Sequence, residues 1–128
     1  AFVTDKKFGA VSLFVGVTRE DIAEDDSRVV TLEFEAHEPL LLAQLNLITN
    51  DCRTNFPNIG NIFIVHRLGV VPVGEANILV AASSPHRNDA MTAIDYLMQR
   101  IKATLPIWKK ERFNNDTHVW KHNSENKW

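Results

Sequence analysis

Hydrophobic positions in the first half of the chain change their period from one segment to the next. Residues 9–19 form a short apolar run rich in valine, which predicts a strand buried on both faces. Residues 20–28 are an acidic loop. Residues 29–36 then alternate apolar with polar positions, which predicts a half-exposed strand antiparallel to the first. Helical spacing of apolar residues over 39–54 predicts an amphipathic helix that ends before Pro57.

The second half of the chain repeats both kinds of pattern. Residues 61–68 and 77–83 are typical of two further strands, separated by a turn that contains glycine and proline. A second helix is expected to begin within residues 84–87 and to end before Pro106, because proline lacks the amide that a continuing helix needs. The core-facing positions of this helix are Ala90, Ile94, Leu97 and Ile101.

The last part of the chain favours extended structure. Residues 108–113 and 117–121 are expected to form short extended segments. Internal repeats and low-complexity linkers are missing from the sequence, so we expect a single domain over residues 1–128. The order of elements predicts an α+β fold, with a mixed or antiparallel sheet and two main amphipathic helices.

Composition narrows the class of protein. A chain of 128 residues with 45% hydrophobic content can bury a core without support from a metal or disulfide. The single cysteine, Cys52, excludes an intrachain disulfide framework, and the sequence has no secretory leader and no apolar run of membrane-spanning length. We therefore expect a cytosolic (cytoplasmic) protein that does not associate with membranes. Because the chain starts at Ala1 and not at methionine, we also expect a trimmed N-terminus.

Charge is distributed unevenly along the chain, whose formal net charge is -2. Residues 1–60 hold ten acidic and five basic residues, whereas residues 61–128 hold six acidic and nine basic residues. The second half is therefore expected to attract an anionic ligand such as a phosphate. The overall balance lacks the strong basic footprint of a nucleic-acid-binding protein, so nucleic acid is not an expected partner.

The segment Ser84-Pro85-His86-Arg87 is the first candidate site. It lies where a strand leads into a helix, and the unpaired amides of a helix N-terminus attract anions. Arg87 is able to bind phosphate through two hydrogen bonds, and His86 to donate a proton or a hydrogen bond. The alternative interpretation is that Ser84 caps the helix and that the two basic side chains are merely solvated.

Each of the other basic candidate residues has both a functional and a structural interpretation. Lys102 lies beside the core stripe of the second helix, either in a pocket under the following turn or as a surface lysine favoured by the helix dipole. In an extended segment Lys109 and Glu111 share one face and Lys110 lies on the other, although an edge strand also uses lysines to prevent pairing with other chains. Arg19 ends the first strand, at a functional site or in an ion pair with a neighbouring acid.

The sequence predicts no metal site and no cofactor. His118 and His122 have the spacing of helical metal ligands, but the segment lacks a helical pattern and a third ligand. Cys52 falls on the core stripe of the first helix and is interpreted as a small buried hydrophobe. The glycines at Gly9 and Gly16 are not followed by the lysine and serine or threonine of a phosphate-binding loop.

Short motifs extend over most of the chain, from about Gly9 to Lys121. They are GAVSLFVGVTR at 9–19, LEFEA at 32–36, HRLG at 66–69, PVGE at 72–75, SPHR at 84–87, Lys102 and PIWKKE at 106–111. In this order they resemble the family of the large, catalytic subunit of molybdopterin synthase. Each motif is weak alone, but the ordered set is specific to that family.

The resemblance implies an α/β-hammerhead fold and a homodimer, with a ubiquitin-like small subunit docked at each end to form a heterotetramer. The implied activity is that of a sulfurtransferase. Sulfur passes from the C-terminal thiocarboxylate of the small subunit to cyclic pyranopterin monophosphate, and two transfers build the dithiolene of molybdopterin. Because sulfur arrives on the partner, this chain needs neither a cysteine nucleophile nor a metal.

The resemblance also implies roles for individual residues. It makes Lys102 and Lys109 catalytic, and it assigns substrate binding to Val17, Thr18, Arg19, His86, Arg87, Lys110 and Glu111. The tail of this chain lacks an arginine that many bacterial members of the family carry. The phosphate contact of that arginine would have to come from Lys121 or Lys127 in this chain.

Two other functions stay open at this point. The chain could be a non-catalytic module that binds a ubiquitin-like partner, or a small protein that binds a phosphorylated metabolite. Convergence of the basic candidates on one pocket would favour the enzyme, whereas scattered positions would favour the module. Those candidates are Arg19, His86, Arg87, Lys102 and Lys109.

Overall fold

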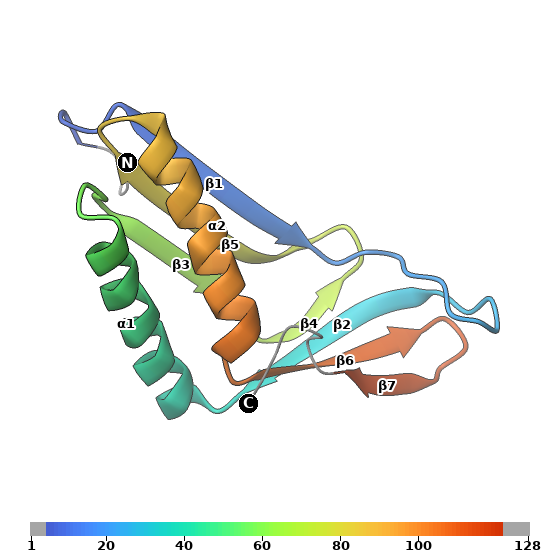
Figure 1. The fold of residues 1–128 in the computed structure, drawn as a ribbon. Coiled ribbons are helices and arrows are strands. Elements are labelled where there is room, and N and C mark those ends of the chain that lie inside the picture. Colours follow the sequence, from blue (N-terminus) through green and yellow to red (C-terminus); the bar gives the residue numbers. More distant parts are fainter. Residues whose placement is uncertain (1–4, 122–128) are drawn as a thin grey trace.

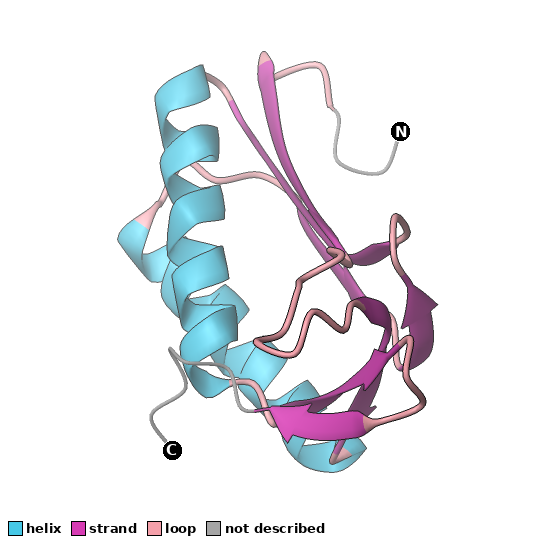
Figure 2. Ribbon diagram, turned by 90° about the vertical axis from the view of Figure 1, so that its right-hand side faces the viewer, coloured by secondary structure: helices cyan, strands magenta, loops and turns pink. Residues whose placement is uncertain are grey.

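Antiparallel sheets and two helices make up the fold of the chain in a computed structural model that describes residues 5–121. The first sheet has the strand order β1-β5-β3, with β1 at Ala10–Val17, β5 at Ala76–Ser84 and β3 at Ile62–His66. Helices α1 (Glu38–Asn55) and α2 (Arg87–Thr104) cover one face of this sheet (Figures 1 and 2). The expected α+β fold with two main helices is confirmed.

The second sheet lies beyond the C-terminal end of α2 (Figure 1). Its strand order is β4-β2-β6-β7, with β4 at Gly69–Pro72, β2 at Val29–Ala36, β6 at Ile107–Phe113 and β7 at His118–Lys121. All of its strand pairs are antiparallel. Because β3 and β4 follow each other in the chain but belong to different sheets, the short link between them connects the two sheets.

The hydrophobic core lies between the helices and the first sheet. The core stripe expected for α2 is confirmed, since Ala90, Ile94, Leu97 and Ile101 are all buried. Cys52 of α1 is also fully buried in this core, where burial raises the pKa of its thiol. The interpretation of Cys52 as a small buried hydrophobe is therefore confirmed. Among the described residues, neither helix is long and apolar enough to cross a membrane.

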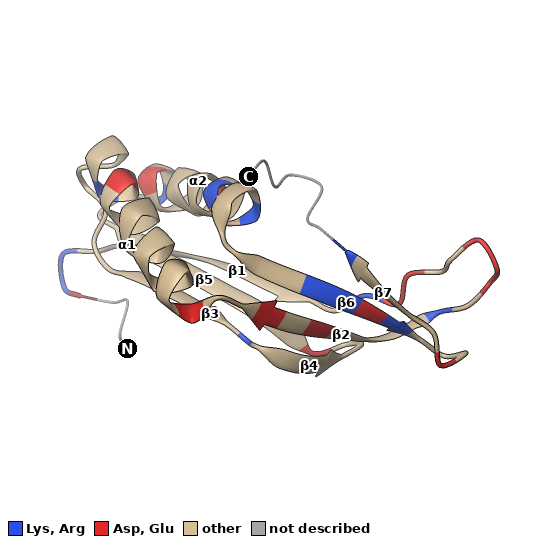
Figure 3. Cartoon of the chain, turned by 90° about the horizontal axis from the view of Figure 1, so that it is seen from below, with Lys and Arg blue, Asp and Glu red and all other residues tan. Residues whose placement is uncertain are grey.

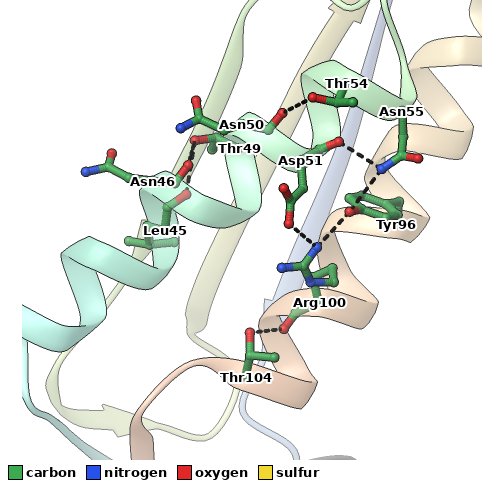
Figure 4. A network of polar contacts seen from close by, with 10 residues as sticks. All are labelled: Leu45, Asn46, Thr49, Asn50, Asp51, Thr54, Asn55, Tyr96, Arg100 and Thr104. Carbon is green, nitrogen blue, oxygen red and sulfur yellow. Dashed lines mark hydrogen bonds and ion pairs between the residues drawn. The ribbon is translucent and has the colours of Figure 1, made fainter.

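Polar side chains add a second connection between the two helices (Figure 4). Arg100 of α2 donates from Nη1 to Asp51 of α1 at 2.8 Å and to the hydroxyl of Tyr96 at 2.7 Å. Asn55 of α1 donates to the same hydroxyl at 3.3 Å. We call these four side chains the helix clamp, because they join α1 to α2 at the edge of the core.

The expected pairing of the first two strands is wrong. β1 pairs with β5, while β2 pairs with β4 and β6 in the other sheet. The cause lies just after β1, where the backbone of Thr18 bonds to Gly74 and Glu75 and so extends the pairing toward β5. The loop over residues 20–28 then carries the chain away to the second sheet.

The expectation that β1 is buried on both faces is also wrong for the single chain. Its residues alternate between partly buried and exposed positions. Val11, Leu13 and Val15 are 46%, 58% and 42% exposed, and Val65 of β3 is 44% exposed on the same sheet. The helices cover only the other face, so the first sheet presents an apolar face without a covering element among the described residues. We call it the open sheet face.

The turn expected between β3 and β5 contains an additional strand. Gly69 has a φ of +86°, a conformation that suits glycine, and it begins the four-residue strand β4. Val71 of β4 lies opposite Leu32 of β2 and is fully buried. This strand was missed because its pattern is too short to show a period, and it forms because β2 offers a free edge.

Candidate functional site

A cavity of about 420 Å³ lies where the C-terminal end of α2 meets the two sheets. Its apolar wall includes Phe14 of β1, Phe34 of β2 and Met98 of α2. The polar residues around it are Arg19, Asp21, His66, Asn77, Lys102, Lys109, Glu111 and Lys121. We call it the basic cavity, because four of these residues are lysine or arginine and two are acids.

A short turn brings Lys102 and Lys109 to the same cavity. α2 stops before Leu105 and Pro106, which are both buried and direct the chain back along the second sheet as β6. Lys102 lies in the last turn of α2, and Lys109 lies on the side of β6 that faces the cavity. Lys102 and Lys109, which are seven residues apart in the sequence, therefore line the same cavity.

The environment of Lys109 favours its neutral form. Burial lowers the pKa of its ammonium group, and the positive charge of Lys102 lowers this pKa further. Lys121 and Arg19 act in the same direction, while the carboxylate of Glu111 opposes them. At neutral pH, Lys109 therefore has a larger fraction of neutral amine than a solvated lysine has.

Glu111 balances the lysines across the β6 and β7 strands. The strand register places Lys109 directly opposite Lys121, an arrangement of like charges that is unfavourable by itself. Glu111 is 7% exposed, and its carboxylate lies 3.1 Å from the Nζ of Lys121. The ion pair gives this buried carboxylate the partner that it needs, and it reduces the repulsion between the lysines.

Arg19 lies at the rim of the basic cavity. Its side chain is 81% exposed, and its guanidinium contacts Asp21 at 3.4 Å. Exposed ion pairs of this kind contribute little to stability, about 0–1 kcal/mol. The arginine is therefore free to exchange Asp21 for an anionic ligand at little cost.

Four of the expected substrate-binding residues do not line the cavity, namely Thr18, His86, Arg87 and Lys110. Lys110 points to the other face of β6, where it pairs with Glu33 at 3.3 Å and lies 4.6 Å from the ring centre of Trp120. Bands of basic and acidic residues lie side by side on β6 and β2 (Figure 3). Because side chains alternate along β6, Lys110 lies on the opposite face of the strand from Lys109 and Glu111.

Val17, the last residue of β1, contributes to the cavity, but the next residue, Thr18, does not. Thr18 is buried, its N–H donates to Glu75 at 3.0 Å, and its carbonyl accepts from Gly74 at 2.9 Å. Because both backbone groups of Thr18 are occupied, they hold the loop next to the cavity and are not available to a ligand.

His86 and Arg87 lie at the opposite end of α2 from Lys102. Sixteen helical positions separate His86 from Lys102, which corresponds to about 24 Å along the axis. The hydroxyl of Ser84 accepts from the N–H of Ala90 at 3.0 Å, so it satisfies an amide of the first helical turn, and the side chain of His86 caps none. Within one chain, Arg19, Lys102 and Lys109 converge, whereas His86 and Arg87 do not.

His66 is a cavity residue that the sequence analysis did not single out. It lies at the end of β3 on the same face as Ile62 and Ile64, which pack against the core. The alternation of these positions was visible in the sequence, but the identity of the residues that the strand end would meet was not. Burial lowers the pKa of the His66 imidazole, so it is neutral at physiological pH.

The described residues include no group of three or more His, Cys, Asp or Glu side chains that could hold a metal ion. His122 and Lys127, which the sequence analysis considered as ligands, lie outside the described residues. The basic cavity offers cations that can bind an anion, a partly buried lysine that can exchange protons, and aromatic rings that can pack against a planar ligand.

Comparison with known proteins adds to this geometry. Residues 1–104 match the model of a family described as MoaE protein. Molybdopterin synthase catalytic subunit 1 of Aedes aegypti is 41% identical over 98% of this chain and 81% of its own length. The molybdopterin synthase catalytic subunit of Taeniopygia guttata is 42% identical over 94% and 76%. A relative of the same name in Drosophila grimshawi is longer, and the chain spans 34% of it.

Solved structures share the fold. Molybdopterin synthase from Staphylococcus aureus aligns with a TM-score of 0.87 and 36% identity over 94% of this chain and 85% of that one. A complex of subunits 1 and 2 of molybdopterin-converting factor from Helicobacter pylori 26695 aligns with a TM-score of 0.77 and 22% identity over 94% and 77%, which supports the fold alone. The chain belongs to the MoaE protein family, the family of molybdopterin synthase catalytic subunits.

Proposed function

We propose that this chain catalyses the transfer of sulfur from the thiocarboxylated C-terminus of a ubiquitin-like small subunit to cyclic pyranopterin monophosphate, forming molybdopterin. The observation that carries the proposal is the convergence of Arg19, Lys102 and Lys109 on one cavity in a member of this family. The cavity also offers aromatic side chains for a planar heterocycle. The cytosolic location expected from the single cysteine belongs to the same proposal.

The cationic groups have different parts in this reaction. Arg19, at the open rim, binds the cyclic phosphate or the thiocarboxylate of the incoming tail. Lys102, which is exposed, supplies positive charge that stabilises the oxyanion formed when water adds to the acyl carbon; this intermediate then collapses to the carboxylate of the tail and leaves the sulfur on the substrate. Lys109 is the better group for proton transfer, because burial and its basic neighbours lower its pKa toward the working range of an acid and base.

A homodimer is part of the proposal, and the open sheet face is its proposed contact. This face presents Val11, Leu13, Val15 and Val65 without a covering element among the described residues. Exposed apolar surface of this kind is typical of an association site. A two-fold axis needs a patch that complements itself, and an apolar face without charges meets that condition.

A two-fold axis through the middle of β1 would also explain the position of His86 and Arg87. The basic cavity lies at the C-terminal end of β1, and Pro85 contacts Gly9 beside its N-terminal end. β1 is about 26 Å long, close to the separation of Arg87 from Lys102 along α2. In an antiparallel dimer, each His86-Arg87 pair would approach the cavity of the other chain and complete its phosphate site.

The rival interpretation is a non-catalytic module that binds a ubiquitin-like partner. It is favoured by one observation, namely that His86 and Arg87 lie outside the cavity of their own chain. The two functions differ in their demand on Lys102. Docking needs only the basic surface as a whole, whereas sulfur transfer needs a cation at this position of the cavity.

The test is reconstitution of molybdopterin formation from purified chain, thiocarboxylated small subunit and cyclic pyranopterin monophosphate. Lys102→Ala is expected to abolish product formation almost completely with an unchanged melting temperature, because Lys102 is exposed and its loss opens no core cavity. Arg112→Ala is the matched control, since Arg112 is an exposed cation on β6 outside the cavity. Near wild-type turnover of Lys102→Ala would refute the catalytic proposal.

A further inference from the structure

His66 is held in the wall of the basic cavity by its packing. Its ring meets the ring of Phe34 edge to face, with centroids 4.8 Å apart and an interplanar angle of 71°. Ile62 and Ile64, on the same face of β3, fix the strand against the core. The imidazole is therefore a preset part of the cavity wall and does not need to be ordered by a ligand.

The hydrogen bond of His66 determines which ring nitrogen carries the proton. Its Nδ1 lies 2.7 Å from the carbonyl oxygen of Arg67. A carbonyl oxygen can only accept, so Nδ1 must donate, and in the neutral ring Nε2 is then an acceptor. Among residues 5–121, no side chain or backbone group donates to Nε2 of His66. Nε2 is not fully buried, so it is accessible to solvent and to a ligand.

Most of the other polar side chains that line the cavity are charged, and Asn77 is the second neutral one among the described residues. Arg19, Lys102, Lys109 and Lys121 are donors, and the carboxylates of Asp21 and Glu111 are paired with Arg19 and Lys121. Asn77 donates from its amide nitrogen to the hydroxyl of Thr18 at 3.3 Å, and its amide oxygen is a neutral acceptor; unlike the imidazole, this acceptor does not change its role with pH. The imidazole thus adds to the cavity a recognition element that the cations lack.

We propose that His66 positions a ligand in the basic cavity by accepting, at Nε2, a hydrogen bond from an N–H group of that ligand. The inference rests on the proposed function, in which both reactants carry such a group. The ring system of cyclic pyranopterin monophosphate has N–H donors, and so has the peptide backbone of the small subunit's C-terminal tail. The shared chemistry is an N–H donor delivered next to the lysines.

Two substitutions separate the acceptor from the packing. His66→Phe keeps a ring against Phe34 but removes Nε2, and His66→Gln restores a neutral acceptor on a flexible chain. We expect His66→Phe to weaken binding roughly threefold to tenfold, the loss of one neutral hydrogen bond. We expect His66→Gln to recover most of this loss, although neither variant keeps the bond to the carbonyl of Arg67.

The binding measurements have two arms. A raised KM for cyclic pyranopterin monophosphate with unchanged affinity for the small subunit identifies the ring as the donor. A weakened Kd for the small subunit with an unchanged KM identifies the peptide tail. Each result supports the inference and names the source of the N–H group. Equal KM and Kd values in the wild type and His66→Phe would overturn it.

A pH profile supplies a readout that packing alone would not change. The charged residues that line the cavity together with His66 are Arg19, Asp21, Lys102, Lys109, Glu111 and Lys121. Because burial lowers the pKa of His66, the ring takes up its second proton in a pH range below that of a solvated histidine, and Nε2 then becomes a donor. Ligand binding by the wild type should weaken as the pH falls through that range relative to His66→Gln. Parallel profiles would contradict the inference.

The free protein gives an independent test. Nitrogen NMR of the histidine ring should show the tautomer protonated at Nδ1, and a bound ligand should shift the Nε2 resonance. A ring protonated at Nε2 in the free protein would overturn the inference without any assay of turnover. If the wild type itself forms no molybdopterin in the reconstituted reaction, the proposed function fails. If it does and the His66 variants behave like the wild type, only the inference fails.

Discussion

Lys109 shows how neighbours change the chemistry of a single residue. On an isolated strand it would be a solvated ammonium group. In the folded chain it faces Lys102 from α2 and Lys121 from β7, and it is partly buried between them. Its pKa therefore reports on the arrangement of the whole site.

Replacing Lys102 by glutamine should raise the pKa of Lys109, because the positive charge that favours its neutral form is removed. Carbon NMR of labelled lysine side chains during a pH titration measures this directly. Lys110→Gln is the matched control, since Lys110 lies on the other face of β6 and pairs with Glu33. An unchanged Lys109 titration in Lys102→Gln, or an equal shift in the control, would contradict the description of the site.

The same shift has a consequence for stability. The folded chain loses the Lys109 proton at a lower pH than the unfolded chain does, so the unfolded state binds more protons between the two pKa values. Stability should consequently rise with pH across that interval, below the ordinary lysine value of 10.5. Lys102→Gln should reduce the slope of stability against pH in urea denaturation.

At the scale of elements, the position of α2 decides whether the cavity exists. This helix packs over the first sheet along its length, with core residues from Ala93 to Ile101, and its last turn presents Lys102 to the basic cavity. The helix clamp between Asp51, Asn55, Tyr96 and Arg100 joins the C-terminal half of α2 to α1 (Figure 4). It is the feature that connects helix packing to the geometry of the site.

Tyr96→Phe should lower the free energy of unfolding by about 1 kcal/mol, because it removes the hydroxyl that Arg100 and Asn55 share but keeps the ring against Phe56. Urea denaturation measures this cost. Thr92→Ala is the control, since its hydroxyl only bonds to Asn88 within the same helix at an exposed position, and we expect a change within about 0.5 kcal/mol. Equal costs for both variants would mean that the clamp adds nothing beyond a surface contact.

At the scale of the whole molecule, two features of the single chain are explained by the proposed homodimer. The open sheet face leaves valines and a leucine in water, and the basic pair at the start of α2 lies far from the cavity. The proposed two-fold arrangement through β1 accounts for both. It makes separate predictions about assembly and about activity.

Leu13→Asp should convert a dimer into a monomer without unfolding the chain, since Leu13 is 58% exposed and a charge there is buried only on association. Light scattering measures the mass, and the dimer of the wild type should persist at high salt because its contact is apolar. Leu42→Asp is the matched control, because Leu42 is 63% exposed on α1 outside the open sheet face. A dimeric Leu13→Asp variant would place the contact elsewhere.

Arg87→Ala and Lys102→Ala should each be nearly inactive alone but regain activity when the two chains are produced together. In a site built from Lys102 of one protomer and Arg87 of its partner, a mixed dimer contains one intact and one doubly altered site. Random mixing would then give about a quarter of the wild-type activity in the reconstituted reaction. Absence of recovery would show that each chain uses its own Arg87 or none.

The sequence by itself determined the local elements and the residues of the core. Periodicity is a property of neighbouring residues, so the helices near 39–54 and 87–104 and the stripe of α2 could be predicted correctly. It also supplied the cations of the site, because residue types do not depend on folding. The order of the motifs indicated the family before any contact was known.

Only the tertiary structure decided which of these parts meet. Strand pairing joins residues that are far apart in the chain. For this reason β1 pairs with β5 and not with β2, and β4 pairs with the free edge of β2. The same long-range packing brought Arg19, Lys102 and Lys109 to one cavity and added His66, while the length of α2 carried Arg87 away. Local patterns hold no information on such distances, because these distances are set by contacts between residues that are far apart in the sequence.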